Sequence, residues 1–492
     1  MSESHRRTGR GATSALLPAL IAATAFGLPS SAQPAFEAVY GGVTSSEVGA
    51  RGAAPVEYCL GGGFVAAGTS TPASGTSDAY VVRTGVNGAR LWEFRYDLGG
   101  NESSAALVEL RNGTGFVVAG TTDAAGDRDI FLLKLNCAGG VAWARTYGSA
   151  DARHEIAADL AQARTGNPLA GTHAGDLVVA GTTQTADGAD SDAFLLRTRV
   201  NGAPVWDRRY RSAGTQQSLG GLTEALRRAG TPTGDIVATG TASLGLPPIY
   251  GYSLRVGGDD GEFTHFDHCA AGYTVDGLDE GASFEAVVEL TTPPHRGQLV
   301  MVGRAASITP PVAMLLRSAR NPCVPLATRR FMSHATPGLA LTLGRDVAEV
   351  RSGASPGQLL LASGLLRFGP PPLPFSAALL SAIDPTTLAP LPGRSSTYGR
   401  QADVASLAIH ASGVVLAGTS RDDPQGVGDP SDLFIVNTDT LGLTGCSDTF
   451  ELESEPWPLI ERVFTLSAAP FLTSAPRPVT RRGQNTGFVS CP

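Results

Sequence analysis

A short apolar segment that ends in glycine recurs seven times along this chain of 492 residues. The first copy runs from Gly63 to Thr69 (GFVAAGT) and the second from Gly115 to Thr121 (GFVVAGT). The copies are spaced 52 to 63 residues apart, a period that suits one four-stranded β-sheet per repeat, as in a β-propeller blade. The recurring residue, which we call the landmark glycine, stands at Gly68, Gly120, Gly181, Gly240, Gly303, Gly364 and Gly418.

Each repeat reads as four strands, which we call a, b, c and d in chain order. Strand a precedes the landmark, as in 105–110, and strand b ends at it. Strand c begins with aspartate, as in Asp78–Arg83, and a turn such as Asn87-Gly88 suits a hairpin. Strand d carries Trp and Tyr four residues apart, as in Trp92 and Tyr96, hence on one strand face. We expect these aromatic residues to pack between blades rather than to bind sugars.

The ends of the repeat region predict how the ring closes. Residues 36–40 (FEAVY) copy the d-strand pattern but precede any strand a, while the seventh repeat lacks a clear d strand after Asn437. Residues 36–40 would then supply the outer strand of blade seven, which removes open sheet edges. In the alternative, residues 449–452 complete that blade and 36–40 form an extra strand. The predicted fold is an all-β, seven-bladed propeller of antiparallel blades closed by an N-terminal strand.

The N-terminus reads as an export signal. Three arginines at positions 6, 7 and 10 precede an apolar stretch over 12–28, and small residues lead to Ala32. We therefore predict a signal peptide over 1–32, a propeller over 33–448 and a C-terminal extension over 449–492 that packs on or flanks the propeller. Cleavage near Ala32 would leave a secreted or periplasmic protein without a transmembrane segment.

Charge and cysteine content narrow the partners further. Loss of residues 1–32 removes three arginines and one glutamate, so the formal net charge changes from −8 to −10. An acidic protein of this kind is not expected to bind nucleic acid. The six cysteines are scattered and permit three disulfides in an exported protein. Cys446 and Cys491 bracket the tail, and we predict that they pair.

The pattern of these motifs resembles the bacterial secreted β-propeller repeat proteins often called SBBP-type. It runs from Gly-Phe-Val-x-Ala-Gly-Thr through a loop, Ser-Asp-x-Phe-Leu-Leu and Asn-Gly to Trp-x-x-x-Tyr-Gly. The resemblance covers 35–448 and is strongest in repeats one to three and seven. The resemblance implies export and the propeller fold. It provides no catalytic residues to carry over to this chain, and the fold by itself does not fix an activity.

Acidic residues at the loop ends are the candidate binding residues. The loops between strands b and c are long and variable, so we predict that they contact a ligand near Asp78, Asp129, Asp192 and Asp432. We expect no cofactor other than calcium, for which Asp187, Asp190 and Asp192 could supply oxygen ligands. Aspartate and glycine are also ordinary turn residues, so the same pattern fits plain loops.

Two further motifs carry less weight. Residues 353–357 (GASPG) match the pattern of a nucleophile elbow, but they fall in a turn before a strand rather than between a strand and a helix. His265, Asp267, His268 and Cys269 form a dense group of metal-capable side chains, but an edge strand and loop with incidental histidines is the better interpretation.

The sequence shows no catalytic apparatus. We therefore expect an exported, monomeric, non-catalytic binding or scaffold module that presents its loops to a protein, an envelope polymer or a glycan. The alternative is a secreted carbohydrate-active hydrolase or lyase with its site at the propeller channel. Carboxylates or arginines that converge at one end of the axis would favour the enzyme, and an apolar loop patch would favour the module.

Overall fold

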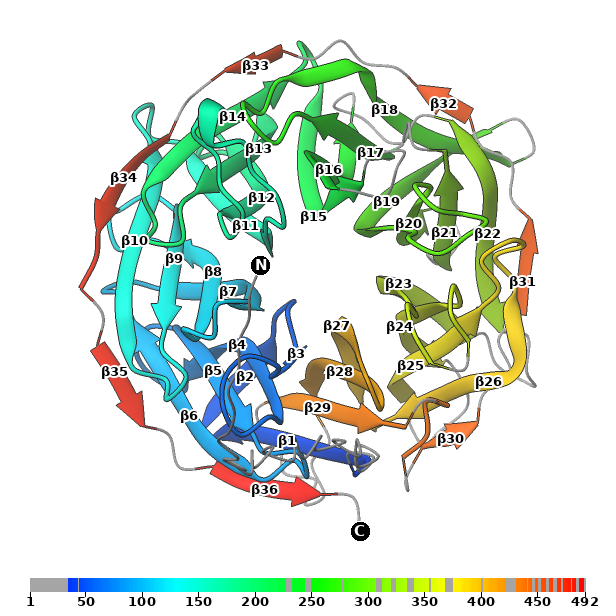
Figure 1. Ribbon diagram of the computed structural model, residues 1–492, viewed down its shortest axis with the longest axis horizontal. Coiled ribbons are helices and arrows are strands. Elements are labelled where there is room, and N and C mark those ends of the chain that lie inside the picture. The colour runs from blue at the N-terminus through cyan, green and yellow to red at the C-terminus, as the bar shows by residue number, and fades with distance from the viewer. Residues whose placement is uncertain are drawn as a thin grey trace, which may run out of the picture. The chain divides into compact units, whose positions relative to one another are not determined.

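The repeats fold as sheets that are arranged radially around an axis (Figure 1). In each repeat, strand a lies nearest the axis and strand d lies farthest from it. The computed structural model describes residues 34–42, 44–226, 232–243, 249–275, 278–306, 312–319, 324–333, 340–353, 355–367, 375–399, 401–421, 431–439, 441–444, 447–449, 453–456, 460–462, 467–469, 472–478, 480–483 and 486–490. The predicted signal peptide, residues 1–32, lies outside them.

Blades 1 to 3 follow the strand order predicted from the repeat. In blade 1, strand a is split into two short strands that both pair with strand b. The strands are β2 (Ser45–Gly49), β3 (Ala54–Pro55), β4 (Phe64–Pro72), β5 (Asp78–Thr84) and β6 (Arg90–Asp97) in blade 1; β7 (Glu102–Glu109), β8 (Phe116–Thr122), β9 (Asp129–Leu135) and β10 (Val141–Ser149) in blade 2; and β11 (His154–Gln162), β12 (Leu177–Gln184), β13 (Ser191–Thr198) and β14 (Pro204–Arg211) in blade 3. A single 3₁₀ turn, η1 (Pro168–Ala170), is found in the described a–b loop of blade 3.

Blades 4 to 6 share one continuous sheet, because the outer strand of one blade pairs briefly with the inner strand of the next. Their strands are β15 (Gln216–Leu226), β16 (Pro232–Ser243), β17 (Ile249–Val256) and β18 (Phe263–Val275); β19 (Leu278–Glu289), β20 (Leu299–Ala306), β21 (Val312–Ser318) and β22 (Pro325–Ser333); and β23 (Ala340–Glu349), β24 (Leu359–Arg367), β25 (Phe375–Ile383) and β26 (Pro390–Tyr398).

Blade 7 joins the two ends of the repeat region, as predicted. Its first three strands are β27 (Ala402–His410), β28 (Gly413–Ser420) and β29 (Asp432–Thr438), and its fourth is β1 (Phe36–Gly42). Strand β1 pairs antiparallel with β29, with Ala38 opposite Ile435. The competing assignment is wrong, because β30 (Asp448–Thr449) pairs with β26 of blade 6 instead.

The core lies between neighbouring blades. Strands b and c are buried over most of their length, and completely in β8 and β5, because each sheet is covered by a blade on both faces. One apolar cluster between blades 7 and 1 combines Phe36 and Tyr40 from β1 with Phe64 and Tyr80 from blade 1. Apolar burial of this kind provides most of the stabilisation of such a ring.

The landmark glycines face a β-bulge in strand a. In blade 3 the register between β11 and β12 shifts between Ala157 and Asp159, next to the pair of Ala157 with Gly181. A Cβ on Gly181 would lie 2.2 Å from the carbonyl oxygen of Ile156, so only glycine fits. Bulges at the corresponding place occur in blades 2, 4, 5, 6 and 7.

Strand d contacts the next blade through its tyrosine. The Tyr147 hydroxyl donates to the Gly202 carbonyl at 2.6 Å, and Tyr96 donates to Gly139 at 2.8 Å. The tryptophans lie against the same turns, since a Cβ on Gly202, at φ 78°, would lie 2.9 Å from Trp143. The prediction that these aromatic residues pack between blades is confirmed at these junctions. Equivalent tyrosine bonds join Tyr40 to Gly88, Tyr210 to Gly261 and Tyr398 to Gly442.

The C-terminal tail runs around the outside of the ring and adds a short fifth strand to every blade (Figure 1). We call its strands the belt: β30, β31 (Glu453–Pro456), β32 (Ile460–Arg462), β33 (Ser467–Ala469), β34 (Leu472–Pro476), β35 (Thr480–Gly483) and β36 (Thr486–Ser490). They pair antiparallel with the outer strands of blades 6, 5, 4, 3, 2, 1 and 7, in that order.

Candidate functional site

The two ends of the ring carry different connections. Because the strands of a blade alternate in direction, the b–c loops and the d–a connections lie on one face, which we call the loop face. The a–b and c–d turns lie on the opposite face, which we call the turn face. Contacts between blades agree with this assignment: the Ser77 carbonyl in a b–c loop accepts from Glu102 N at the next strand a, at 2.8 Å.

The predicted ligand-contact aspartates lie at the loop face but beneath its loops. Asp78, Asp129 and Asp192 are buried, and Asp432 is half-buried. Each stands at or next to the start of a c strand, where it packs under the end of strand d. Their role in ligand contact stays a prediction, and in this structure their carboxylates contact other protein groups.

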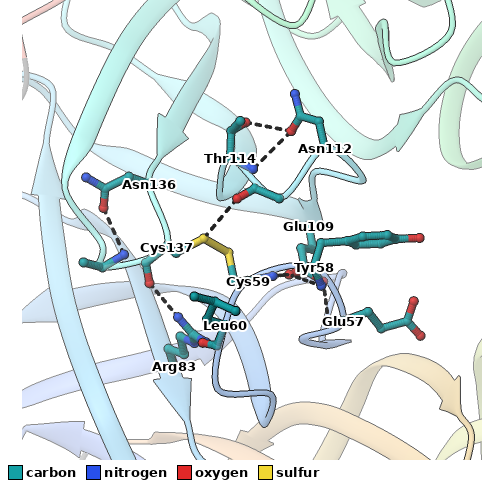
Figure 2. Close-up of a disulfide and its surroundings, with 12 residues drawn as sticks. Glu57, Tyr58, Cys59, Leu60, Arg83, Glu109, Asn112, Thr114, Asn136 and Cys137 are labelled. Carbon is teal, nitrogen blue, oxygen red and sulfur yellow. Dashed lines mark hydrogen bonds between the residues drawn. A yellow bond between two sulfur atoms is a disulfide. The ribbon is translucent and has the colours of Figure 1, made fainter. Parts of the chain in front are cut away.

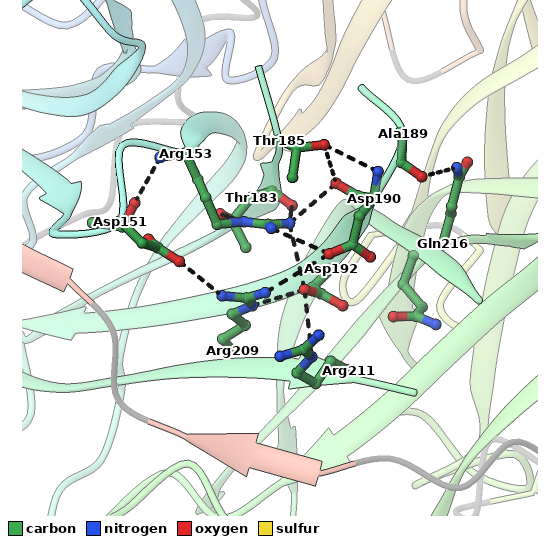
Figure 3. A network of polar contacts seen from close by, with 12 residues as sticks. Asp151, Arg153, Thr183, Thr185, Ala189, Asp190, Asp192, Arg209, Arg211 and Gln216 are labelled. Atoms are coloured by element: carbon green, nitrogen blue, oxygen red, sulfur yellow. Dashed lines mark hydrogen bonds and ion pairs between the residues drawn. The ribbon is translucent and has the colours of Figure 1, made fainter. Parts of the chain in front are cut away.

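Arginines hold two of the three predicted calcium ligands of blade 3, Asp190 and Asp192 (Figure 3). Asp192 Oδ2 lies 2.7 Å from Arg209 Nε and 3.5 Å from an Arg153 nitrogen. Asp190 Oδ2 lies 3.2 Å from Arg153 Nη1, while Asp187 is exposed and accepts from Ala189 N. These guanidinium groups supply the positive charge that a calcium ion would bring. Calcium binding here stays a prediction, and the arginines would compete with it.

Three carboxylates converge between blades 1 and 2 instead. Ligand atoms of Asp78, Asp97 and Glu102 lie within 4.8 Å of one another. Arg95 Nε lies 3.9 Å from Asp78, and Glu102 accepts from Leu98 N, Gly100 N and the Thr122 hydroxyl. An acidic cluster alone does not make a metal site, and we assign none here.

The remaining sequence motifs add no site among the described residues. The side chains of 264–280, which include His265, Asp267, His268 and Cys269, lie outside the described residues, and so do Cys446 and Cys491. Ser355 lies in the a–b turn of blade 6, where its carbonyl accepts from Gln358 N, and β24 follows it. A nucleophile elbow requires a helix after the serine, so the motif is a turn.

The axis is crossed by one arginine. Arg51 extends from blade 1 to donate to the Arg345 carbonyl of blade 6 at 3.3 Å, and lies 3.7 Å from Glu285 of blade 5. Its charge acts on Asp159 and Asp346, whose pKa values are raised by burial, that of Asp346 to about 6, and lowered in part by Arg51. The cluster joins opposite sides of the ring.

The two axial aspartates have a structural function. Each accepts two backbone N–H groups, one from its own strand a and one from the next blade. Asp159 accepts from Leu160 N and Leu222 N at 2.8 Å, and Asp346 accepts from Val347 N and Leu407 N at 2.8 Å. Both carboxylates are thus occupied where the bulges of strand a leave backbone donors without sheet partners.

A disulfide fixes one loop of the turn face (Figure 2). Cys59, in the a–b loop of blade 1, pairs with Cys137 in the c–d turn of blade 2, across a sequence separation of 78 residues. Glu109 of blade 2 accepts three successive backbone donors, from Glu57, Tyr58 and Cys59, at 2.7 to 3.0 Å. The loop backbone is therefore held on both sides.

Apolar side chains project from this fixed loop. Leu60 is 95% exposed and Tyr58 is 45% exposed, while the Leu60 carbonyl accepts from Arg83 Nη2 at 2.6 Å. Most exposed large apolar side chains of the described residues lie at the turn face; on blades 7, 1 and 2 they are Leu441, Leu443, Tyr58, Leu60, Val86, Leu91 and Val141. Ile249 is a counterpart at the loop face.

Arginines also gather at the turn face near the axis. Arg111, Arg164 and Arg351 each stand two residues after the acidic or amide residue that ends strand a. Burial lowers the pKa of Arg351, and the charge of Arg164 lowers it further, although the two come from blades 6 and 3. The recurring pattern of Glu or Gln, one apolar residue, Arg, one residue and Gly is a sequence signal that predicts this group.

Comparison with known proteins adds no family to these observations. The chain matches none of the protein-family models in a scan, and a search of curated proteins also finds no match. Among the described residues, no helix combines the length and apolar character needed to cross a bilayer.

Proposed function

We propose that this chain is an exported, non-catalytic binding or scaffold module that engages a partner protein through its turn face. The observation that carries the proposal is the exposure of Leu60 on a loop fixed by a disulfide and four backbone hydrogen bonds. When a partner covers an apolar side chain that is exposed to water, the free energy falls. Because the loop is already rigid, it loses little conformational entropy on binding.

The residue types on this loop and the presence of a disulfide both support the proposal of an exported, protein-binding module. Tyrosine and large apolar groups that project from rigid loops are typical anchors of protein interfaces. The Cys59–Cys137 disulfide indicates an oxidising compartment, as expected of an exported protein. The resemblance to bacterial secreted β-propeller repeat proteins, stated from the sequence, supports the same proposal.

The carbohydrate-active alternative has weaker support. It requires carboxylates that are available to a substrate at the channel, and the converging pair Asp159 and Asp346 already accepts backbone donors and faces Arg51. We therefore place the partner on the loop of residues 57–60 rather than in the channel.

Cross-linking with substitution tests the proposal. Residues 33–492 would be cross-linked to fractionated envelope and culture-medium proteins, and the contacting peptides identified by mass spectrometry. We expect cross-links from the turn face of blade 1, and a loss of about tenfold in capture for Leu60→Ser, the effect of about 1.4 kcal/mol of lost contact.

The matched control is Ile249→Ser, which removes a similarly apolar exposed side chain at the loop face. This variant should capture the partner like the wild type. Equal capture by Leu60→Ser, or cross-links confined to the b–c loops, would instead assign binding to the loop face. Capture of glycan or envelope polymer alone would contradict a protein partner.

A further inference from the structure

A cavity opens at the turn face between blades 2 and 3. Its volume is about 350 Å³, within the range of small-molecule sites. Arg111, Asn112 and Gln162 line it with Arg164, Ala174 and Val200. It therefore combines two guanidinium groups and two amides with an apolar side.

The cavity wall positions Arg111. Its Nη2 donates to the Gln162 carbonyl at 3.0 Å and its Nη1 to the Ala163 carbonyl at 3.3 Å. Its backbone N donates to Gln162 Oε1 at 3.0 Å, and Gln162 Nε2 donates to the Gly175 carbonyl. The guanidinium plane is thus fixed by neutral acceptors, and no ion pair of Arg111 with a described carboxylate is formed.

Arg164 has no partner for its guanidinium among the described residues. Only its backbone N is bonded, to Glu224 Oε2 at 2.6 Å. Glu224 is buried and already accepts from Thr165 N and the Thr165 hydroxyl with its other oxygen. No carboxylate oxygen of the described residues lies within 4.0 Å of either guanidinium, although the chain as a whole is acidic.

Electrostatics agree with the geometry. Burial lowers the pKa of Arg111, the charge of Arg164 lowers it further, and the charges of Glu224 and Tyr58 raise it in part. Two like charges that face one cavity repel each other, and an anion placed between them would remove that repulsion. Guanidinium groups bind carboxylate and phosphate groups with two parallel hydrogen bonds.

We propose that this cavity binds a small organic anion, whose carboxylate or phosphate group contacts Arg111 and Arg164. The Asn112 amide donates to the polar part of the same ligand, because its Oδ1 is already used by Thr114. Ala174 and Val200 contact the ligand's apolar face. The cavity lining includes no residue of the loop 57–60, although the Tyr58 backbone lies beside Gly113. Different variants test the cavity and the proposed protein-binding function, so each can fail without the other.

Calorimetric titration of the folded protein tests the site. The probes are inorganic phosphate, glucuronate and neutral glucose, each added to the wild type at low and at high ionic strength. We expect an oxyanion probe to bind, glucose not to bind, and added salt to weaken the binding. Comparison of phosphate with glucuronate identifies which oxyanion the cavity prefers.

The variant Arg164→Gln should weaken binding of the oxyanion probe about tenfold, because a charge-assisted contact between the Arg164 guanidinium and the ligand is lost. The control Arg128→Gln makes the same charge change at an exposed position on the loop face and should bind like the wild type. Both variants should unfold at the wild-type temperature, since neither guanidinium has a structural partner. Failure of both oxyanions to bind, or equal weakening by the two variants, would overturn the proposal.

Discussion

A contact with the neighbouring strand a requires glycine at the landmark position of strand b. Strand a bulges at the point where it pairs with this residue, so the carbonyl oxygen before the bulge approaches the position of a Cβ. Blade 6 shows the rule by exception: Ser363 occupies the paired place, and its partner across the sheet is Gly344. The sequence landmark Gly364 is thus one residue out of register there.

Replacement of a landmark glycine should be costly. Gly181→Ala places a Cβ 2.2 Å from a backbone oxygen and 2.5 Å from the Phe194 ring, so we expect a loss of about 3 kcal/mol in unfolding free energy. Gly188→Ala is the control, since it has φ 70° and open space, and should cost about 1 kcal/mol. Urea unfolding measures both, and similar losses would contradict a steric role for the bulge.

Buried glutamates at the loop face should make stability depend on pH. Glu102 and Glu155 are fully buried, and burial raises the pKa of each to about 7 from 4.5. A raised carboxyl pKa contributes stability that is full below pH 4.5 and lost as pH rises through about 7, at about 1.4 kcal/mol per pKa unit.

The comparison that isolates this effect uses Glu102→Gln with Glu155→Gln. Unfolding free energies would be measured from pH 5 to 8 for the wild type and the double variant. The stability of the wild type should fall more steeply with pH than that of the variant, because the variant lacks both titrating groups. Parallel profiles would show that these carboxyl groups titrate normally.

At the scale of elements, the turns of one blade are fixed by the next. Glu109 holds the a–b loop of blade 1, and Glu224 and Glu349 hold those of blades 3 and 5 in the same way. Tyrosine hydroxyls and the disulfide join c–d turns to neighbours on the same face. These turns are therefore fixed to their neighbours, as a surface for recognition requires.

Loss of the disulfide should increase the mobility of the a–b loop of blade 1 more than that of the rest of the ring. In the double variant Cys59→Ser and Cys137→Ser, we expect about 2 to 4 kcal/mol lower stability, because a long loop closure is lost. Hydrogen exchange should increase over residues 56–63 and stay unchanged in the b and c strands of blade 3. Unchanged exchange in that loop would mean that the Glu109 hydrogen bonds fix it alone.

At the scale of the whole molecule, the belt covers the outer edges of the blades. A d strand without a partner exposes a row of backbone donors and acceptors that can pair with another copy. The belt pairs with all seven d strands, in short segments of two to five residues. Each segment contributes little, so the belt acts through its sum, and it favours the monomer that we propose.

Removal of residues 448–492 should therefore produce association. We expect the truncated chain to form oligomers through its outer strands and to return to the monomer when a separate 448–492 peptide is added. Light scattering after size exclusion measures both states. Thr473→Pro, which interrupts only the pairing of Thr473 with Gly148, is the control and should stay monomeric. A monomeric truncated chain would show that the belt is dispensable for solubility.

The sequence by itself determined the blades and the closure of the ring. Strands b and c are continuous apolar segments, and 36–40 copy strand d, so these elements follow from local pattern. It also located Asp78, Asp129, Asp192 and Asp432 at strand starts, although it could not show their burial. Local pattern succeeds here because the four repeat strands of blades 1 to 6 come from consecutive residues, and blade 7 takes only its fourth strand, β1, from the other end of the repeat region.

Only the tertiary structure decided the belt, the disulfide and the axial and cavity clusters. Belt strands of two to five residues are too short to show a period, and their partners lie in other blades. Cys59 finds Cys137, and Arg51 reaches Glu285, across sequence separations that no local pattern encodes. The ring brings these groups together because closure sets every blade beside two neighbours and around one axis.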